Sequence, residues 1–146
     1  MSGPFLNDGM CVQQYQYSFA EDAGATGIIT LSSKANKDPL PVGAVVVNAL
    51  AHVKTAFTSG GSATLTWGNG DDPDGYFASV AVASLTANAA WLPGSVAGAL
   101  IWDDTNDNIE PLYIDDTTTG AVVCEIGTAA MTAGIGSIYL SYIRVR

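Results

Sequence analysis

The feature of this sequence that most constrains its fold is a two-residue alternation of apolar and polar side chains. In residues 45–57 the odd positions are mostly apolar, whereas Asn48 and His52 occupy even positions. Residues 63–67 alternate in the same way. Because successive side chains of a strand point to opposite faces of a sheet, both runs predict half-buried β-strands with their odd positions inward.

The segment between and after these two runs has the composition of turns. Ser59, Gly60 and Gly61 separate the runs, and glycine readily adopts the positive φ angles of a tight hairpin. Residues 71–75, with the sequence DDPDG, form a second group of turn residues. We therefore predict that residues 55–75 form a hairpin followed by an acidic turn that leads into the next element.

Further short runs rich in β-branched and aromatic residues follow at similar spacing. They are separated by clusters of Gly, Pro, Asn and Asp, and they cover residues 13–19, 27–32, 98–102, 110–114, 121–126 and 137–145. Residues 76–88 fit either a turn or two of helix or another strand. This pattern predicts an all-β protein, built as an antiparallel sandwich or barrel.

Length and charge narrow the class further. A chain of 146 residues is the length of one ordinary domain, so we expect a single domain over residues 1–146. It is 48% hydrophobic but only 13% charged, and its formal net charge is −9. The five basic residues are mostly scattered, whereas phosphate binding needs a clustered basic face, so no nucleic-acid partner is expected.

We expect neither a membrane partner nor export through a signal peptide. The first ten residues have no basic segment followed by an apolar one, and the longest apolar stretch, residues 42–51, is too short to span a bilayer. The only cysteines, Cys11 and Cys124, are expected to be buried thiols and not a disulfide. Two cysteines are also too few for a thiolate metal site.

The two ends of the chain have different expected roles. Residues 1–12 are predicted to form an N-terminal arm and residues 137–146 a C-terminal strand. Apolar residues change from even to odd positions between Tyr142 and Ile143, which predicts a β-bulge or a strand tip with a different neighbour. Apolar side chains on both faces indicate a subunit interface at Tyr142, Ile143 and Val145, although coverage within one chain would give the same pattern.

Two acidic clusters could in principle hold calcium. The first contains Asn69, Asp71, Asp72 and Asp74, and the second lies within residues 103–110. The second begins like an EF-hand loop but lacks its central glycine, its final glutamate and flanking helices. Asp, Asn and Gly also gather at turns because their side chains bond nearby backbone, so we interpret both clusters as turns and predict no metal site.

No catalytic, cofactor or small-molecule substrate site is predicted. The only histidine, His52, lies in a predicted strand without a nucleophile signature beside it. Trp67 and Trp102 follow core patterns, whereas Trp91 precedes Pro93 and Gly94 and is expected to be exposed. An exposed tryptophan beside acidic turns leaves a carbohydrate-binding role as an alternative.

Three segments resemble small structural proteins of tailed-bacteriophage virions, such as head decoration or cement proteins. They are residues 17–31 (YSFAEDAGATGIITL), 39–86 and 132–145 (TAGIGSIYLSYIRV), while residues 88–131 match less well. The resemblance implies a jelly-roll-like β-sandwich of about eight strands that acts without a cofactor. It further implies a protein made in the host cytoplasm that binds the major capsid protein on the outer head surface as a homotrimer. A glycan- or receptor-binding module of a head or tail fibre is the alternative.

Overall fold

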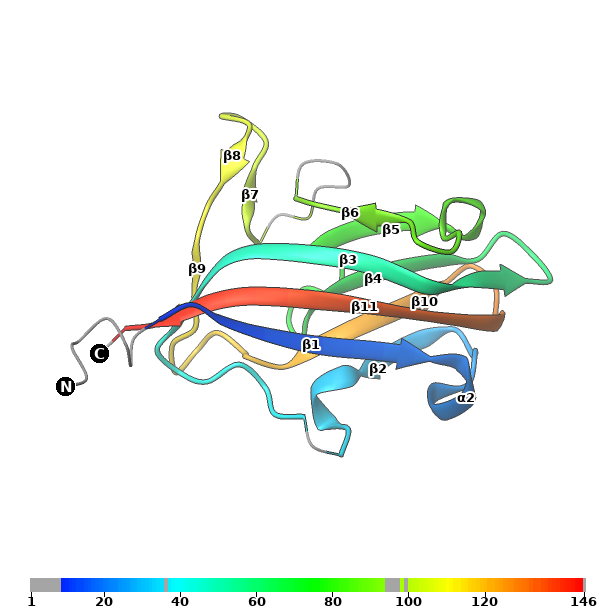
Figure 1. The fold of residues 1–146 in the computed structure, drawn as a ribbon, viewed down its shortest axis with the longest axis horizontal. Helices are drawn as coiled ribbons and strands as arrows, with labels where there is room; N and C mark the ends of the chain where they lie inside the picture. The colour runs from blue at the N-terminus through cyan, green and yellow to red at the C-terminus, as the bar shows by residue number, and fades with distance from the viewer. Residues whose placement is uncertain (1–8, 36, 94–97, 99, 146) are drawn as a thin grey trace.

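The computed structural model describes residues 9–35, 37–93, 98 and 100–145, and within them the chain forms two antiparallel sheets and a hairpin. The first sheet has the order β1-β11-β3-β6, with β9 also paired to β3 (Figure 1). The second has the order β2-β10-β4-β5. The strands of the first sheet are β1 (Cys11–Ser18), β3 (Ala44–Ser59), β6 (Ala90–Trp91), β9 (Leu112–Tyr113) and β11 (Met131–Arg144). The other elements are α2 (Phe19–Asp22), β2 (Gly27–Thr30), η1 (Leu31–Ser33), β4 (Thr64–Asn69), β5 (Phe77–Ala81), η2 (Val82–Ser84), β7 (Trp102–Asp103), β8 (Asn108–Ile109) and β10 (Val122–Gly127).

The strand order is that of a jelly roll. β1 and β3 belong to the first sheet and β2 and β4 to the second, so the chain crosses between the sheets at each step. The last two strands then return, β10 between β2 and β4 and β11 between β1 and β3. β6 and β9 pair with different parts of β3, so together they occupy the edge position of the first sheet beside β3. The predicted all-β, jelly-roll-like sandwich is therefore confirmed, with two layers and the interleaved order of two Greek keys.

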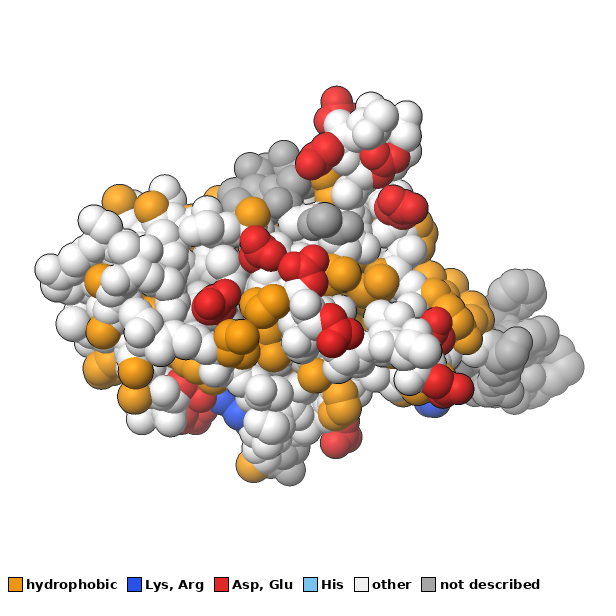
Figure 2. Space-filling model, turned by 180° about the vertical axis from the view of Figure 1, so that it is seen from behind, with side chains coloured by type: hydrophobic (Ala, Val, Ile, Leu, Met, Phe, Trp, Pro, Cys, Tyr) orange, Lys and Arg blue, Asp and Glu red, His pale blue; other side chains and the backbone are white. Residues whose placement is uncertain are grey.

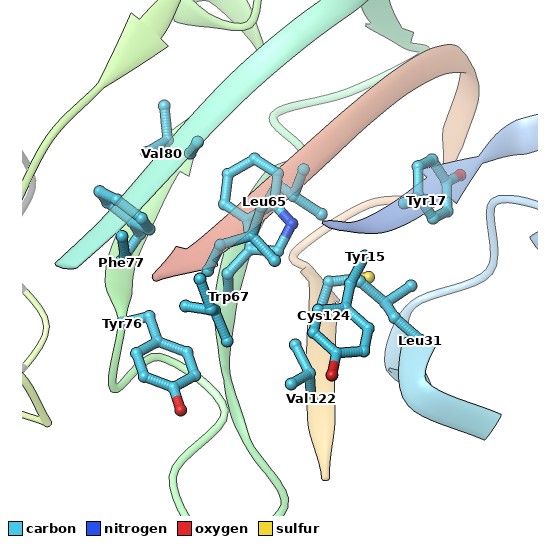
Figure 3. Packing of buried hydrophobic residues seen from close by; sticks show 14 of the residues in the cluster. Tyr15, Tyr17, Leu31, Leu65, Trp67, Tyr76, Phe77, Val80, Val122 and Cys124 are labelled. Atoms are coloured by element: carbon cyan, nitrogen blue, oxygen red, sulfur yellow. The ribbon is translucent and has the colours of Figure 1, made fainter. Parts of the chain in front are cut away.

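Large apolar side chains fill the space between the sheets. Trp67 is fully buried and meets Phe77 edge-on, with ring centroids 6.3 Å apart (Figure 3). Phe57 stacks on Tyr17 at 5.5 Å and lies against β11, where a Cβ on Gly134 would come within 2.4 Å of its ring. β11 thus carries no side chain where Phe57 packs against it.

The connection after β3 is not the predicted hairpin. β3 lies in the first sheet and β4 in the second, so the segment at Gly60 and Gly61 crosses the sandwich. Neither glycine has a positive φ angle, and Gly27, Gly43 and Gly134 are the described glycines that do. The true hairpin joins β4 to β5, and the acidic turn closes it.

The predicted inward positions of the first half of β3 were also wrong. Ala44 and Val46 are buried, whereas Val45 and Val47 are only half-buried. β11 residues Ser141 and Tyr142 pair with Asn48 and Val46, so Val47 is an extra residue on β3. This bulge reverses the parity, and after it odd positions such as Ala49 point inward as predicted. The irregularity expected near Tyr142 is present, but its extra residue belongs to the neighbouring strand.

Several predicted boundaries move. β1 begins at Cys11, inside the arm predicted for residues 1–12, of which residues 1–8 lie outside the described part. The C-terminal strand begins at Met131, well before the predicted residue 137. In the run predicted for residues 98–102, of which residue 99 lies outside the described part, Trp102 is the one described residue in a strand. The ambiguous segment 76–88 contains the strand β5 and then the short 3-10 helix η2.

Candidate interaction surface

The outer face of the first sheet is the side turned away from the core. The inward residues of β1 and β11, such as Tyr15 and Ile138, pair across the strands, so the residues between them point outward. The outer face is made by Val12, Gln14 and Gln16 on β1, Ser137, Tyr139, Ser141 and Ile143 on β11, and Val45, Asn48, Leu50, His52 and Lys54 on β3. The amides of Gln14 and Gln16 both donate to the Ser137 hydroxyl, at 3.0 and 3.5 Å.

The strands of this sheet contain no acidic residue, although the chain has 14. Their only ionisable basic side chains are those of His52, Lys54 and Arg144. Seen from behind, on the side of the second sheet, the molecule shows many exposed carboxylates (Figure 2). The negative charge is therefore segregated away from the outer face of the first sheet.

The start of β1 and the end of β11 lie at the same tip of the sandwich (Figure 1), and exposed apolar side chains gather there. We call the set Met10, Val12, Val45, Tyr113, Ile143 and Val145 the terminal patch. Val45 pairs with Ile143 on one side and with Tyr113 on the other, so these three form a row across the strands. Val12 is 61% exposed, Met10 59%, Tyr113 49% and Val145 45%.

The structure separates the three residues predicted for an interface. Ile143 and Val145 belong to the terminal patch, and the Val145 amide donates to the Gly43 carbonyl oxygen at 2.8 Å. Tyr142 instead lies opposite Val46 and packs against the core. Burial raises the pKa of its hydroxyl, with a smaller contribution from the nearby Cys11 thiol. The sequence did not indicate Met10, Val12 or Tyr113, because only the pairing of distant strands brings them beside Ile143.

A second apolar feature lies further along the same sheet. A shallow hollow of about 340 Å³ is lined by Leu50, Ala90, Trp91 and Leu92. Leu92 is 52% exposed, while Trp91 is half-buried and packs partly against the core. Sugar sites combine an aromatic face with several polar groups that bond the hydroxyls, and the indole N–H of Trp91 is the one polar side-chain group among the described lining residues. This hollow therefore suits an apolar protein side chain better than a glycan.

The other two tryptophans are placed differently. Trp67 is fully buried, as its pattern predicted. Trp102, predicted to be in the core, is half-buried at the start of the β7–β8 hairpin.

The acidic clusters are turns, as predicted. The Asn69 side-chain oxygen accepts hydrogen bonds from the amides of Asp71 and Asp72 at 3.0 and 2.8 Å. Asp103 caps its own turn by accepting from the Thr105 amide at 2.8 Å, and bonding to the neighbouring Asn106 lowers its pKa. Within the described ranges, no three His, Cys, Asp or Glu side chains are grouped to hold a metal ion.

Hydrogen bonds also change the pKa values of two further carboxyl groups, those of Asp72 and Asp115. Hydrogen bonding between Asp72 and Asp74 raises the pKa of Asp72. Asp115, which lies outside both predicted acidic clusters, accepts hydrogen bonds from the side chain of Thr117 and from the amides of Thr117 and Thr118. These bonds lower the pKa of Asp115 to about 2.

The remaining reactive side chains do not converge. His52 lies on the outer face, paired in register with Ser137 and Ala90, and no strand of its sheet carries a carboxylate. Cys124 is fully buried, and burial raises the pKa of its thiol to about 12. Cys11 is half-buried at the start of β1, so the expectation of two buried thiols is right only for Cys124. Both are free, as predicted.

Among the described residues, no helix has the length and apolar character needed to cross a membrane. No family model matches the sequence, and no curated protein matches it either.

The chain is a jelly roll of two antiparallel sheets, and solved structures share this fold. A chain of the cyanophage Pam1 capsid asymmetric unit aligns with a TM-score of 0.59 at 20% identity, covering 99% of this chain and 91% of that one. A chain of the capsid of Ralstonia phage GP4 aligns with a TM-score of 0.59 at 17% identity, covering 94% and 86%. A chain of the acidic stable capsid of Helicobacter pylori bacteriophage KHP30 gives 0.51 at 17% identity, covering 92% and 86%.

Proposed function

We propose that this protein is a non-enzymatic structural component of a phage virion, a decoration or cement protein that binds the outer head shell and stabilises it. The observation that carries the proposal is the jelly roll shared, over nearly the whole chain, with chains from three phage capsids. Its partners would be the major capsid protein and further copies of itself, as a homotrimer, at the outer capsid surface.

The extent of the likeness supports a subunit role. The alignments cover 86–91% of the phage chains, so those chains are only slightly longer than this one. The similarity therefore concerns whole polypeptides of similar size, and not one module inside a much larger protein. A small separate chain in a capsid has to attach through its surface. The exposed apolar side chains on the acid-free sheet are the candidates for that attachment.

The charge distribution is consistent with an outward-facing subunit. Exposed carboxylates keep a crowded particle surface hydrated and disfavour contact with DNA phosphates. The acid-free sheet supplies a face on which protein contact does not require burying carboxylates, which is costly without a cationic partner. The described side chains bring together no nucleophile, base and carboxylate in one cleft, and chemistry is not needed to account for the arrangement.

The decisive experiment is reconstitution on shells. Purified protein is added to shells of its own phage that lack it, and bound copies are counted by sedimentation and located by electron microscopy. We expect saturable binding at symmetry-related sites on the outside and a higher temperature of shell rupture. Binding to host cells or polysaccharide with no binding to shells would contradict the proposal and support a fibre module. Binding to duplex DNA at physiological salt would contradict the outward orientation.

A further inference from the structure

We propose that the terminal patch and the outer face beside it form the contact between copies of this chain. The inference rests on the homotrimer of the proposed function, and it names the surface that would hold that assembly together. It is tested in solution without shells, so its outcome is separate from that of the reconstitution experiment.

Charge favours this surface for self-association. Each copy carries a net charge of −9, and the strands of the first sheet contribute none of the acidic residues. Copies that meet through these strands therefore place no carboxylate of the strands themselves in the contact. Contact through the acidic turns would bring like charges together, which costs free energy.

Exposed apolar side chains are concentrated at the same place. Among the residues that the structure describes, ten large hydrophobic side chains are exposed, and five of them lie at this tip: Met10, Val12, Val42, Tyr113 and Val145. The half-buried Val45 and Ile143 connect them across the strands. Single exposed apolar residues are ordinary, but a contiguous group on a soluble protein indicates a contact surface.

The rest of the outer face is compatible with an identical partner. Gln14, Asn48, Tyr139 and Ser141 carry groups that both donate and accept hydrogen bonds, so they can bond to one another across a contact between copies. β3 has 16 residues and β11 has 14, but β1 has 8 and β6 and β9 have 2 each, so at about 3.3 Å per residue and about 4.8 Å per strand the face covers roughly 700 Å². A standard protein interface buries about 800 Å² per partner, so a contact of that size would use this face together with the exposed residues of the tip.

The position of the patch suits a three-fold assembly. A ring of three requires each copy to offer two different contact regions, because the same residue does not pair with itself except on a two-fold axis. The terminal patch lies at a tip, where three copies could meet around a common axis. Each patch would then touch one neighbour along its β1 side, at Val12, and the other along its β9 side, at Tyr113.

The test uses matched charge insertions at exposed positions. Val12→Asp and Val145→Asp change the patch, and Ile28→Asp is the control, since Ile28 is 56% exposed on β2 of the second sheet. Sedimentation equilibrium of the full chain at micromolar concentration is expected to give wild type and Ile28→Asp a multiple of the 15.0 kDa chain mass. The patch variants should have a dissociation constant raised at least about tenfold, with unchanged circular dichroism.

Three results would overturn the inference: a wild-type protein that is monomeric at every concentration, patch variants that associate as strongly as wild type, or a control that dissociates as readily as the patch variants. A monomeric wild type that still saturates shells would remove this inference and leave the proposed decoration function intact. A protein that associates in solution through the terminal patch but does not bind shells would support this inference and contradict the proposed decoration function.

Discussion

Replacing Asp22 should destabilise the protein more than replacing any other surface carboxylate on α2. Its carboxylate accepts a hydrogen bond from the Ser18 amide at 2.8 Å and from the Lys34 ammonium at 2.5 Å. Lys34 also donates to the Gln16 carbonyl oxygen at 2.6 Å. Only 9% of the Asp22 side chain and 21% of the Lys34 side chain are exposed. This cluster ties the free edge of β1 to α2 and to the segment after η1.

The size of the effect follows from what Asp22→Ala leaves behind. The amide of Ser18, a residue only 7% exposed, loses its acceptor, and an unpaired buried donor costs about 1–3 kcal/mol. Lys34 keeps its carbonyl partner but loses its short ion pair in a partly buried site, which adds about 1 kcal/mol. We therefore expect the free energy of unfolding to fall by about 2–4 kcal/mol and Tm by about 5–12 °C.

The assay is urea unfolding followed by circular dichroism, with two comparison variants. Glu21 contacts the same Lys34 ammonium at 3.3 Å, but its side chain is 69% exposed, so Glu21→Ala should cost at most about 0.5 kcal/mol. Asp22→Asn keeps an acceptor for the amide and removes the charge, so its effect should be intermediate. If Asp22→Ala and Glu21→Ala agree within about 0.5 kcal/mol, the burial argument is wrong.

Three further predictions follow from single sites. Gly120→Ala should cost about 3 kcal/mol or more in urea unfolding, because its Cβ would lie 1.9 Å from the Leu40 carbonyl oxygen, whereas Gly60→Ala, with open space around it, should change stability by less than about 0.5 kcal/mol. Because the pKa of Asp72 is raised in the folded state, its contribution to stability should be lost as the pH rises from 3.8 toward neutrality, and Asp74→Asn should lose less stability than wild type over this range, by about a few tenths of a kcal/mol in the same assay. The buried Cys124 thiol should resist a thiol reagent in the native protein and react after denaturation, and rapid native labelling of both cysteines would contradict its burial.

The alternation of side chains was sufficient to predict the class of fold but not the partner of each strand. Residues 45–57 and 63–67 are strands, as their pattern indicated. Hairpins and connections that cross a sandwich have the same local composition of small turn residues, and strand pairing with distant segments decides between them. β3 pairs with β11, whose sequence lies at the other end of the chain, so the segment around Gly60 could not be assigned from its own residues.

The bulge shows how a pattern can indicate an irregularity without locating it. The parity change at Tyr142 and Ile143 arises next to the point where β3 carries the extra residue Val47. Register is a property of a pair of strands, so a single sequence run cannot tell which member contains the insertion. β11 itself stays in unbroken register with β1 through Tyr142, which leaves Ile143 on the outer face and Tyr142 against the core.

The absence of acidic residues from the strands of the first sheet indicates a contact surface only in combination with the exposed apolar residues beside it. Asp is rare in strands generally because its side chain favours turns, and the strands of the second sheet also carry a single acidic residue, Glu125. In those second-sheet strands, Ile28 alone is a large apolar side chain left exposed. The first sheet combines an uncharged face with Val12, Tyr113 and their neighbours at one tip, and water around such a group is released when a partner covers it. That combination, and not low charge alone, distinguishes the two faces of this sandwich.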